Sequence, residues 1–81
     1  MMALALAPWR ERNPLRRWRL TEGLTVADAA IMVGVSSNTL TKWEAGGGTP
    51  APERMARMAS VTRNKRIEKE WSTWQKEQQS A

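Results

Sequence analysis

Residues 34–44 of the 81-residue chain read GVSSNTLTKWE, which places small polar side chains between apolar ones. Ser36 is a residue type that caps helices, because its hydroxyl accepts a hydrogen bond from an otherwise unpaired backbone N–H. Leu40 and Trp43 are three residues apart and therefore share one helix face. The opposite face then carries Ser37, Asn38, Thr41 and Lys42. The pattern predicts a short helix, from about Ser37 to Ala45, with one buried face and one polar face.

A second short helix precedes this one and ends at Gly34. Thr25 and Asp28 have the spacing of a capping box in which Asp replaces Glu. The apolar run that follows is Val26, Ala27, Ala29, Ala30, Ile31 and Val33. Gly34 permits the positive φ of a tight turn without steric cost, and the small Ala30 lets the second helix cross close by. Two short helices joined by residues 34–36 have the spacing of a helix-turn-helix.

Three further helices are expected around this pair. One begins at Asn13-Pro14, where Asn caps the helix and Pro is tolerated at its first position. Another begins at Pro52, and the last runs from residue 63 to residue 79. Their apolar positions are, in order, Leu15, Trp18 and Leu20; Met55, Met58, Ala59 and Val61; and Ile67, Trp71, Trp74 and Gln78. Helical spacing recurs in each set.

The fold class expected from these patterns is all-α, a compact four- to five-helix domain that contains a helix-turn-helix. Residues 1–12 are expected to form a flexible tail, residues 13–62 the helix-turn-helix domain, and residues 63–81 a C-terminal helix that packs on the domain or dimerises. No run approaches the roughly 20 apolar residues that span a bilayer. We therefore expect a cytoplasmic protein with no membrane partner.

Composition argues for a binding protein and against an enzyme. The chain has neither cysteine nor histidine, so the usual nucleophile–base pairs are missing. Its eight acidic residues are scattered, and we expect no metal site and no cofactor. The net charge of +5 favours phosphate-bearing partners, although solubility alone also accounts for such a charge.

The chain resembles the phage-repressor-like (Cro/CI-type) helix-turn-helix domains from about residue 15 to residue 59. The resemblance rests on Leu15, Arg19, Gly23-Leu24-Thr25, Ala30, Gly34-Val35-Ser36, Leu40, Trp43-Glu44, Gly46, Pro50 and Met55. It implies a lambda-repressor-like domain whose third helix lies in the DNA major groove. The implied function is a sequence-specific, double-stranded-DNA-binding transcriptional regulator of phage or bacterial origin, either a Cro-like repressor or a controller protein. Such readers commonly bind palindromic operators as homodimers.

The same resemblance assigns roles to individual residues. Ser37, Asn38 and Lys42 occupy base-reading positions, and Arg19 and Glu44 occupy positions that often form a structural ion pair. Many relatives have Gln where this chain has Val26, so that contact is expected to be lost or to be replaced by Thr25. The glycine loop after the reading helix lacks the basic residues that relatives often have there, and Arg10, Arg12, Arg16 and Arg17 are expected to compensate. The set expected at DNA is Arg16, Arg17, Thr25, Ser36, Ser37, Asn38, Thr39, Thr41 and Lys42; the alternative for the polar side chains is a solvated helix face.

The tryptophan-bearing ends of the chain leave two alternatives open. Ile67, Trp71 and Trp74 either fold back on the domain and complete its core, or form the seam of a homodimer. For Leu4, Leu6 and Trp9 the alternatives are a disordered tail, a packing arm and a partner-docking peptide, and we expect a flexible tail that orders on binding. The alternative function is a helical protein-interaction module that docks on RNA polymerase or another regulator through these tryptophan-bearing segments.

Overall fold

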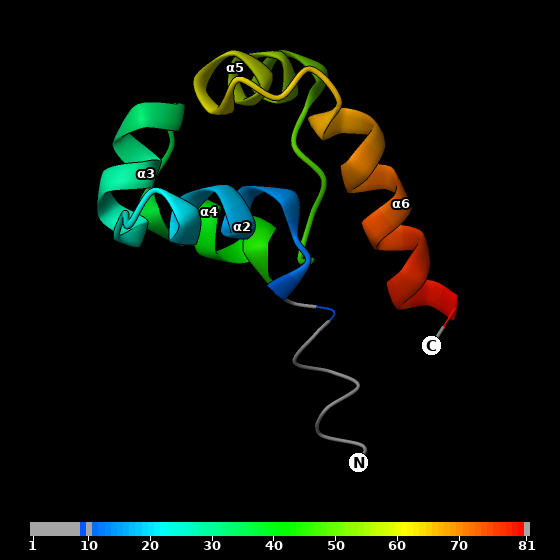
Figure 1. The fold of residues 1–81 in the computed structure, drawn as a ribbon. Coiled ribbons are helices and arrows are strands. Elements are labelled where there is room, and N and C mark those ends of the chain that lie inside the picture. The colour runs from blue at the N-terminus through cyan, green and yellow to red at the C-terminus, as the bar shows by residue number, and fades with distance from the viewer. Residues whose placement is uncertain (1–8, 10, 81) are drawn as a thin grey trace.

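The computed structural model describes residue 9 and residues 11–80, with side chains up to residue 77. Helices are the only regular elements in this described part of the chain, which confirms the all-α prediction (Figure 1). In chain order they are α2 (Pro14–Thr21), α3 (Val26–Val33), α4 (Ser37–Glu44), α5 (Pro52–Thr62) and α6 (Ile67–Ser80). Helices α3 and α4 pack against each other, while α6 lies beside both α2 and α5.

Side-chain caps start the first three helices where the sequence predicts. The side chain of Asn13 accepts from the backbone N–H of Arg16 at 2.9 Å, and Pro14 opens α2. Thr25 caps α3, and Ser36 caps α4 in the same way. Each cap satisfies a backbone donor that has no partner within its own helix.

The turn between α3 and α4 is built around Gly34, whose φ is +84°. This left-handed conformation ends α3, and the N–H groups of Gly34 and Val35 both donate to the carbonyl of Ala30, at 2.8 and 3.0 Å. Only glycine adopts it without a steric cost. The chain therefore leaves α3 at a fixed angle, which sets the direction of α4.

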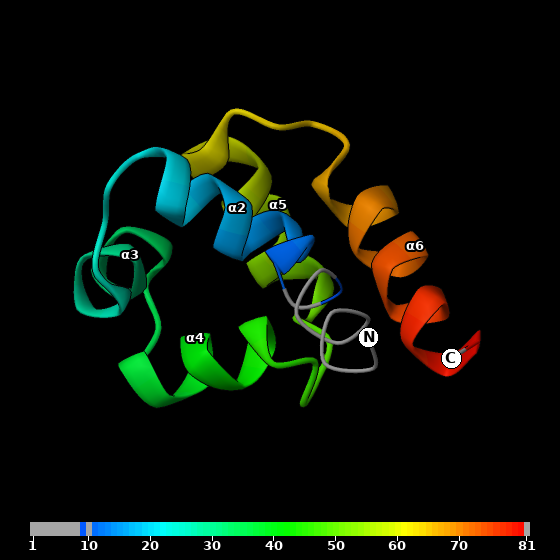
Figure 2. The same cartoon turned by 60° about the horizontal axis from the view of Figure 1, so that its bottom comes forward.

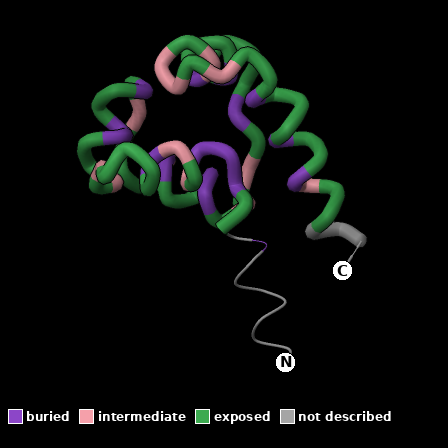
Figure 3. The backbone as a smooth tube through the Cα atoms, viewed as in Figure 1, coloured by how far each residue is buried: buried purple, intermediate pink, exposed green. Residues whose placement is uncertain are grey.

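The core lies where the helices face one another, as the buried segments in Figure 3 show. Its members in the described chain are Trp9, Leu15, Ala29, Ala30, Val33, Leu40, Trp43, Met55, Met58, Ile67, Trp71 and Trp74. Two large residues of the expected apolar stripes are exposed instead, Leu20 to 51% and Ile31 to 77%. Each follows a buried residue, Arg19 or Ala30, and one residue along a helix turns the side chain by about 100°.

The predicted start of the last helix, at residue 63, is wrong by one turn. Arg63 has a φ of +56° and ends α5 in the left-handed conformation. Asn64 then accepts from the N–H of Arg66 with its side chain, at 3.1 Å, and from the N–H of Ile67 with its carbonyl, at 3.2 Å. Helix α6 begins only after this turn.

The position of Trp9 corrects the expectation of a tail through residue 12. Its ring stacks on that of Trp74, with centroids 4.3 Å apart and planes 6° from parallel. Each indole N–H donates to the other residue's backbone carbonyl, at 2.9 Å from Trp9 and 2.6 Å from Trp74. We call this arrangement the tryptophan clasp. An ion pair between Arg12 and Glu77 extends it, whereas Leu4 and Leu6 lie outside the described residues.

The residues expected at a dimer seam are buried within the single chain. Trp71 has no exposed surface, Ile67 has 1% and Trp74 has 2%. Trp71 and Trp74 also contact each other edge to face. The structure therefore realises the packing alternative, in which these three side chains complete an otherwise small core.

Candidate nucleic-acid interface

Helix α4 divides sharply into a buried and an exposed face. Leu40 is fully buried and Trp43 nearly so, whereas Ser37, Asn38, Thr41 and Lys42 are all exposed. Figure 2 shows α4 along one edge of the molecule. The exposed face therefore points away from the rest of the fold, and the four polar side chains are presented together.

The hydroxyls of Ser36 and Thr39 are engaged with α4 itself. Ser36 Oγ accepts from the backbone N–H of Thr39 at 3.1 Å and lies 2.9 Å from Thr39 Oγ1. These two residues stabilise the first turn of the helix. Their remaining hydrogen-bonding capacity lies at the helix N-terminus, where unpaired N–H groups favour an anion.

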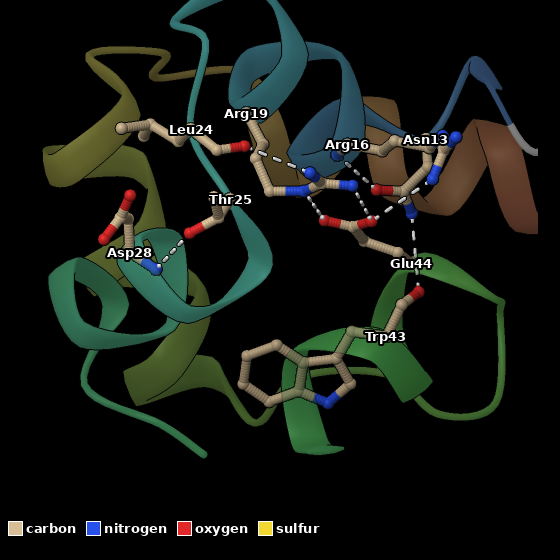
Figure 4. A network of polar contacts seen from close by, with 8 residues as sticks. All are labelled: Asn13, Arg16, Arg19, Leu24, Thr25, Asp28, Trp43 and Glu44. Carbon is tan, nitrogen blue, oxygen red and sulfur yellow. Dashed lines mark hydrogen bonds and ion pairs between the residues drawn. The ribbon is translucent and has the colours of Figure 1, made fainter. Parts of the chain in front are cut away.

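An ion pair holds the C-terminal end of α4 against α2. Arg19 donates from Nε to Glu44 Oε2 at 2.8 Å and from Nη2 to Oε1 at 3.0 Å, a bidentate arrangement (Figure 4). Its Nη1 donates to the carbonyl of Leu24 at 3.1 Å. Both charged residues are buried, with 8% of Arg19 and 6% of Glu44 exposed. Neither side chain reaches the exposed face, so the pair joins α4 to α2 within the fold.

The hydrogen bond that Arg19 donates to Glu44 raises the pKa of Arg19; burial acts in the opposite direction, and the negative charge of Glu44 adds to the increase. A raised pKa in the folded state stabilises the fold at every pH below the ordinary arginine pKa, and that stabilisation is lost only as the pH rises above it. Arg19 is therefore charged throughout the pH range in which proteins are handled. The ion pair that orients α4 is therefore not broken by loss of the Arg19 charge within that range.

Two neighbouring arginines of the predicted set lie on different flanks of α2. Arg16 approaches Glu44, with Nη1 3.6 Å from Oε1, and lines a small cavity of about 190 Å³ together with Thr41. Arg17 is exposed and lines a separate groove beside α6. The structure therefore brings Arg16 to the α4 side and leaves Arg17 apart from it.

Thr25 is exposed at the start of α3, where its side chain accepts from the N–H of Asp28 at 3.1 Å. Val26 follows it, half-buried, and lines the same small cavity as Arg16 and Thr41. Thr25 thus offers a hydroxyl at the N-terminus of α3, and Val26 offers no polar group. A contact from Thr25 to a partner stays a prediction.

Lys42 lies against the glycine loop that follows α4. A Cβ on Gly47 would stand 2.8 Å from Lys42 Cγ and 3.2 Å from its carbonyl oxygen. The N–H of Gly47 donates to that carbonyl at 2.8 Å. The absent side chain at Gly47 thus makes room for the aliphatic part of Lys42, a role for the glycines that the sequence reading did not foresee.

A comparison with family models matches residues 13–70, well over half of the chain, to a helix-turn-helix domain. The chain belongs to this family. Its motif is the pair α3 and α4 with the Gly34 turn, and DNA is the partner that the family indicates. Domains of this family are typically not enzymes. Neither the comparison with curated proteins nor that with solved structures gave a significant match.

Two arginines at the turn of the helix-turn-helix domain were not singled out from sequence. Arg54 Nη1 donates to the carbonyl of Gly34 at 3.0 Å, and Arg57 Nη2 lies 3.5 Å from the carbonyl of Met32. Both are exposed residues of α5. They place positive charge where the C-terminal carbonyls of α3 attract it, next to the start of α4. Cations commonly lie near the C-terminal ends of helices. No pattern in the local sequence, however, indicates that residues of α5 contact the turn after α3.

No group of three or more acidic side chains is placed to hold a metal ion among the described residues. No described helix is both long and apolar enough to cross a membrane.

Proposed function

We propose that this helix-turn-helix domain is a sequence-specific regulator of transcription, of the Cro-like repressor or controller type, and that α4 enters the major groove of double-stranded DNA. One observation carries the proposal: Ser37, Asn38, Thr41 and Lys42 are exposed together on a helix whose opposite face is buried. A helix that reads base edges must be rigidly held and must present donors and acceptors on one side.

The proposed base contacts follow from side-chain chemistry. An Asn38 amide can both donate to and accept from adenine, and the Lys42 ammonium can donate to the acceptors of guanine. Ser37 and Thr41 add hydroxyls that pair with either kind of edge, and the Thr41 methyl can meet the methyl of thymine.

Phosphate contacts are proposed around this reading face. Thr25 and Ser36 stand at the N-termini of α3 and α4, where hydroxyls and backbone N–H groups suit a phosphate. Thr39 and Arg16 complete the set, because Thr39 bonds to Ser36 and Arg16 lines a cavity with Thr41. Arg17 is left out of the proposed contacts, since it lies on the other flank of α2.

A homodimer on a palindromic operator remains part of the proposal. Ile67, Trp71 and Trp74 are buried within one chain, so two copies would have to pair through other residues. Because Trp71 and Trp74 are buried, they are not presented to a partner, and docking on RNA polymerase through the tryptophan-bearing segments is not favoured.

The test is selection from a random double-stranded DNA library at near-physiological salt. The wild-type chain is compared with the double variant Asn38→Ala, Lys42→Ala. A matched control, Lys65→Ala with Ser72→Ala, removes one cation and one polar side chain from exposed positions outside α4. We expect wild type and control to enrich the same motif, and the α4 variant to lose or blur it.

The symmetry of the enriched motif tests the proposed homodimer. A palindrome supports the homodimer, and a single half-site supports the reading helix while rejecting a symmetric pair. If wild type enriches no motif, sequence-specific reading by α4 is rejected.

A further inference from the structure

A groove of about 570 Å³ runs between the N-terminal part of α2 and one side of α6. Four basic residues line it, Arg12, Arg17, Arg66 and Lys69, together with two acidic ones, Glu70 and Glu77. It shares no lining residue with the small cavity beside α4. The groove is therefore separate from the face proposed to read DNA.

The charges in the groove do not cancel. Glu77 is paired with Arg12, and Glu70 Oε1 accepts from Asn64 Nδ2 at 2.8 Å. The side chains of Arg17, Arg66 and Lys69 have no hydrogen bond or ion pair within the described chain. Both carboxylates are thus engaged, while three cations face the groove without a partner.

The groove is long as well as basic. Arg66 immediately precedes α6, and Glu70 and Glu77 continue the same stripe along the helix, one turn and then two turns further on. This stripe covers about 17 Å at the helical rise per residue. An extended peptide of about five residues has the same length. Arg17, Arg66 and Lys69 come from α2, the turn before α6 and α6 itself, so a segment that follows the groove can contact all three.

We propose that this groove binds an extended acidic segment of a partner protein. Carboxylates of the segment would pair with Arg17, Arg66 and Lys69, and the exposed hydroxyl of Thr73 can hydrogen-bond to its backbone. A nucleic acid fits this surface less well, because an evenly charged phosphate backbone would pass Glu70 and Glu77. The domain would then hold DNA on the α4 side and a protein on the α6 side.

The experiment measures binding of a defined probe, a fluorescein-labelled peptide of alternating aspartate and serine residues, by fluorescence anisotropy at low salt. In an extended chain this alternation places every carboxylate on one side. The reference peptide has asparagine in place of aspartate. The groove variant is Arg17→Gln with Lys69→Gln, and the matched variant is Lys42→Gln with Lys65→Gln, which removes the same charge from outside the groove.

We expect the aspartate peptide to bind the wild-type chain and the asparagine peptide not to bind. The groove variant should lose about tenfold in affinity for the acidic peptide, which corresponds to two exposed ion pairs. The matched variant should change by less than about twofold. For a mixed-sequence DNA duplex the order should reverse, with the matched variant losing more because it lacks Lys42.

Three results would overturn the proposal. The first is equal loss of peptide affinity in both variants, which would reflect net charge alone. Another is a loss of duplex affinity in the groove variant as large as its loss of peptide affinity, which would make the groove a nucleic-acid surface. The last is an absence of peptide binding by the wild-type chain.

Discussion

Glu44 illustrates how a single residue ties the reading helix to the fold. It is the last residue of α4 and also the partner of Arg19, which comes from α2, 25 residues earlier in the chain. Replacing Glu44 leaves the charge of Arg19 buried without an ionic partner, which costs more than the pair itself contributes. Stability and the orientation of α4 are therefore coupled at this residue.

We expect Glu44→Ala to lower the free energy of unfolding by about 3–5 kcal/mol, because Arg19 would remain buried and unpaired. Chemical denaturation followed by circular dichroism measures the loss. Glu77→Ala provides the control, since its partner Arg12 is half-exposed and exposed pairs contribute less than about 1 kcal/mol. Similar losses in the two variants would show that burial does not strengthen the Arg19–Glu44 pair.

Asn38 is a second single residue with a predicted effect, in this case on DNA binding and not on stability. Its side chain is exposed and has no hydrogen bond within the described chain, so Asn38→Ala should leave the fold intact. We expect it to weaken binding to the selected DNA site by about 1–3 kcal/mol and to relax the preference at one base pair. Titration of a scrambled duplex is the control, and its affinity should not change. An unaltered preference at every position would remove Asn38 from the base-reading set.

The element that decides the geometry is the turn between α3 and α4. Gly34 fixes its backbone, and Arg57 lies so close that a Cβ on Gly34 would stand 3.1 Å from Arg57 Nε. Gly23, at the turn before α3, has a similar φ of +70°, but no atom of the described chain lies within 4 Å of its hypothetical Cβ. The two glycines therefore share a backbone requirement and differ in their surroundings.

Gly34→Ala and Gly23→Ala should each lower the free energy of unfolding by about 1–2 kcal/mol, the cost of a left-handed non-glycine residue. We expect Gly34→Ala to cost more, because Arg57 must also move away from the end of α3. Thermal denaturation of the two variants measures the difference. In an Arg57→Ala background the two costs should become equal; a difference that persists there would have to arise from the backbone alone.

At the scale of the whole molecule, the tryptophan clasp joins the start of the described chain to its last helix. Trp9 and Trp74 are 65 residues apart and hold each other by stacking and two hydrogen bonds. Both lie outside the matched range 13–70. The clasp therefore lies outside the part of the chain that matches the family, and it helps to hold α6 in place.

We expect Trp9→Ala to lower the free energy of unfolding by about 3–5 kcal/mol, as for other buried tryptophans. Trp9→Phe keeps an aromatic ring on Trp74 and loses the donated hydrogen bond, so its cost should be nearer 1 kcal/mol. Equilibrium denaturation of both variants gives the comparison. If Trp9→Ala is as stable as wild type, the segment before α2 contributes nothing to the fold.

How far the sequence predicts this structure depends on the distance over which each feature acts. Asn13, Thr25 and Ser36 cap helices through neighbours three residues away, so their roles can be read locally. The faces of α4 follow from helical periodicity alone. The pairing of Trp9 with Trp74 has no local pattern, because either indole packs equally well against many partners.

The candidate site shows the same limit. Arg16 and Arg17 are adjacent and chemically identical, yet they point to different flanks of α2, and only the positions of α4 and α6 distinguish them. The fit of Lys42 over Gly47 likewise depends on the path of the loop after α4. Sequence thus identified which residue types are present near the reading helix, and the tertiary packing decided which of them meet.

The tryptophan clasp also bears on the order of events in folding. Closing a loop of this length before other contacts form loses much chain entropy, whereas the turns within α3 and α4 close over a few residues. The clasp should therefore form after the transition state. Contacts made that late slow unfolding without speeding folding. In stopped-flow experiments Trp9→Ala should accelerate the unfolding rate and leave the folding rate nearly unchanged, so that the clasp acts mainly on the lifetime of the folded molecule.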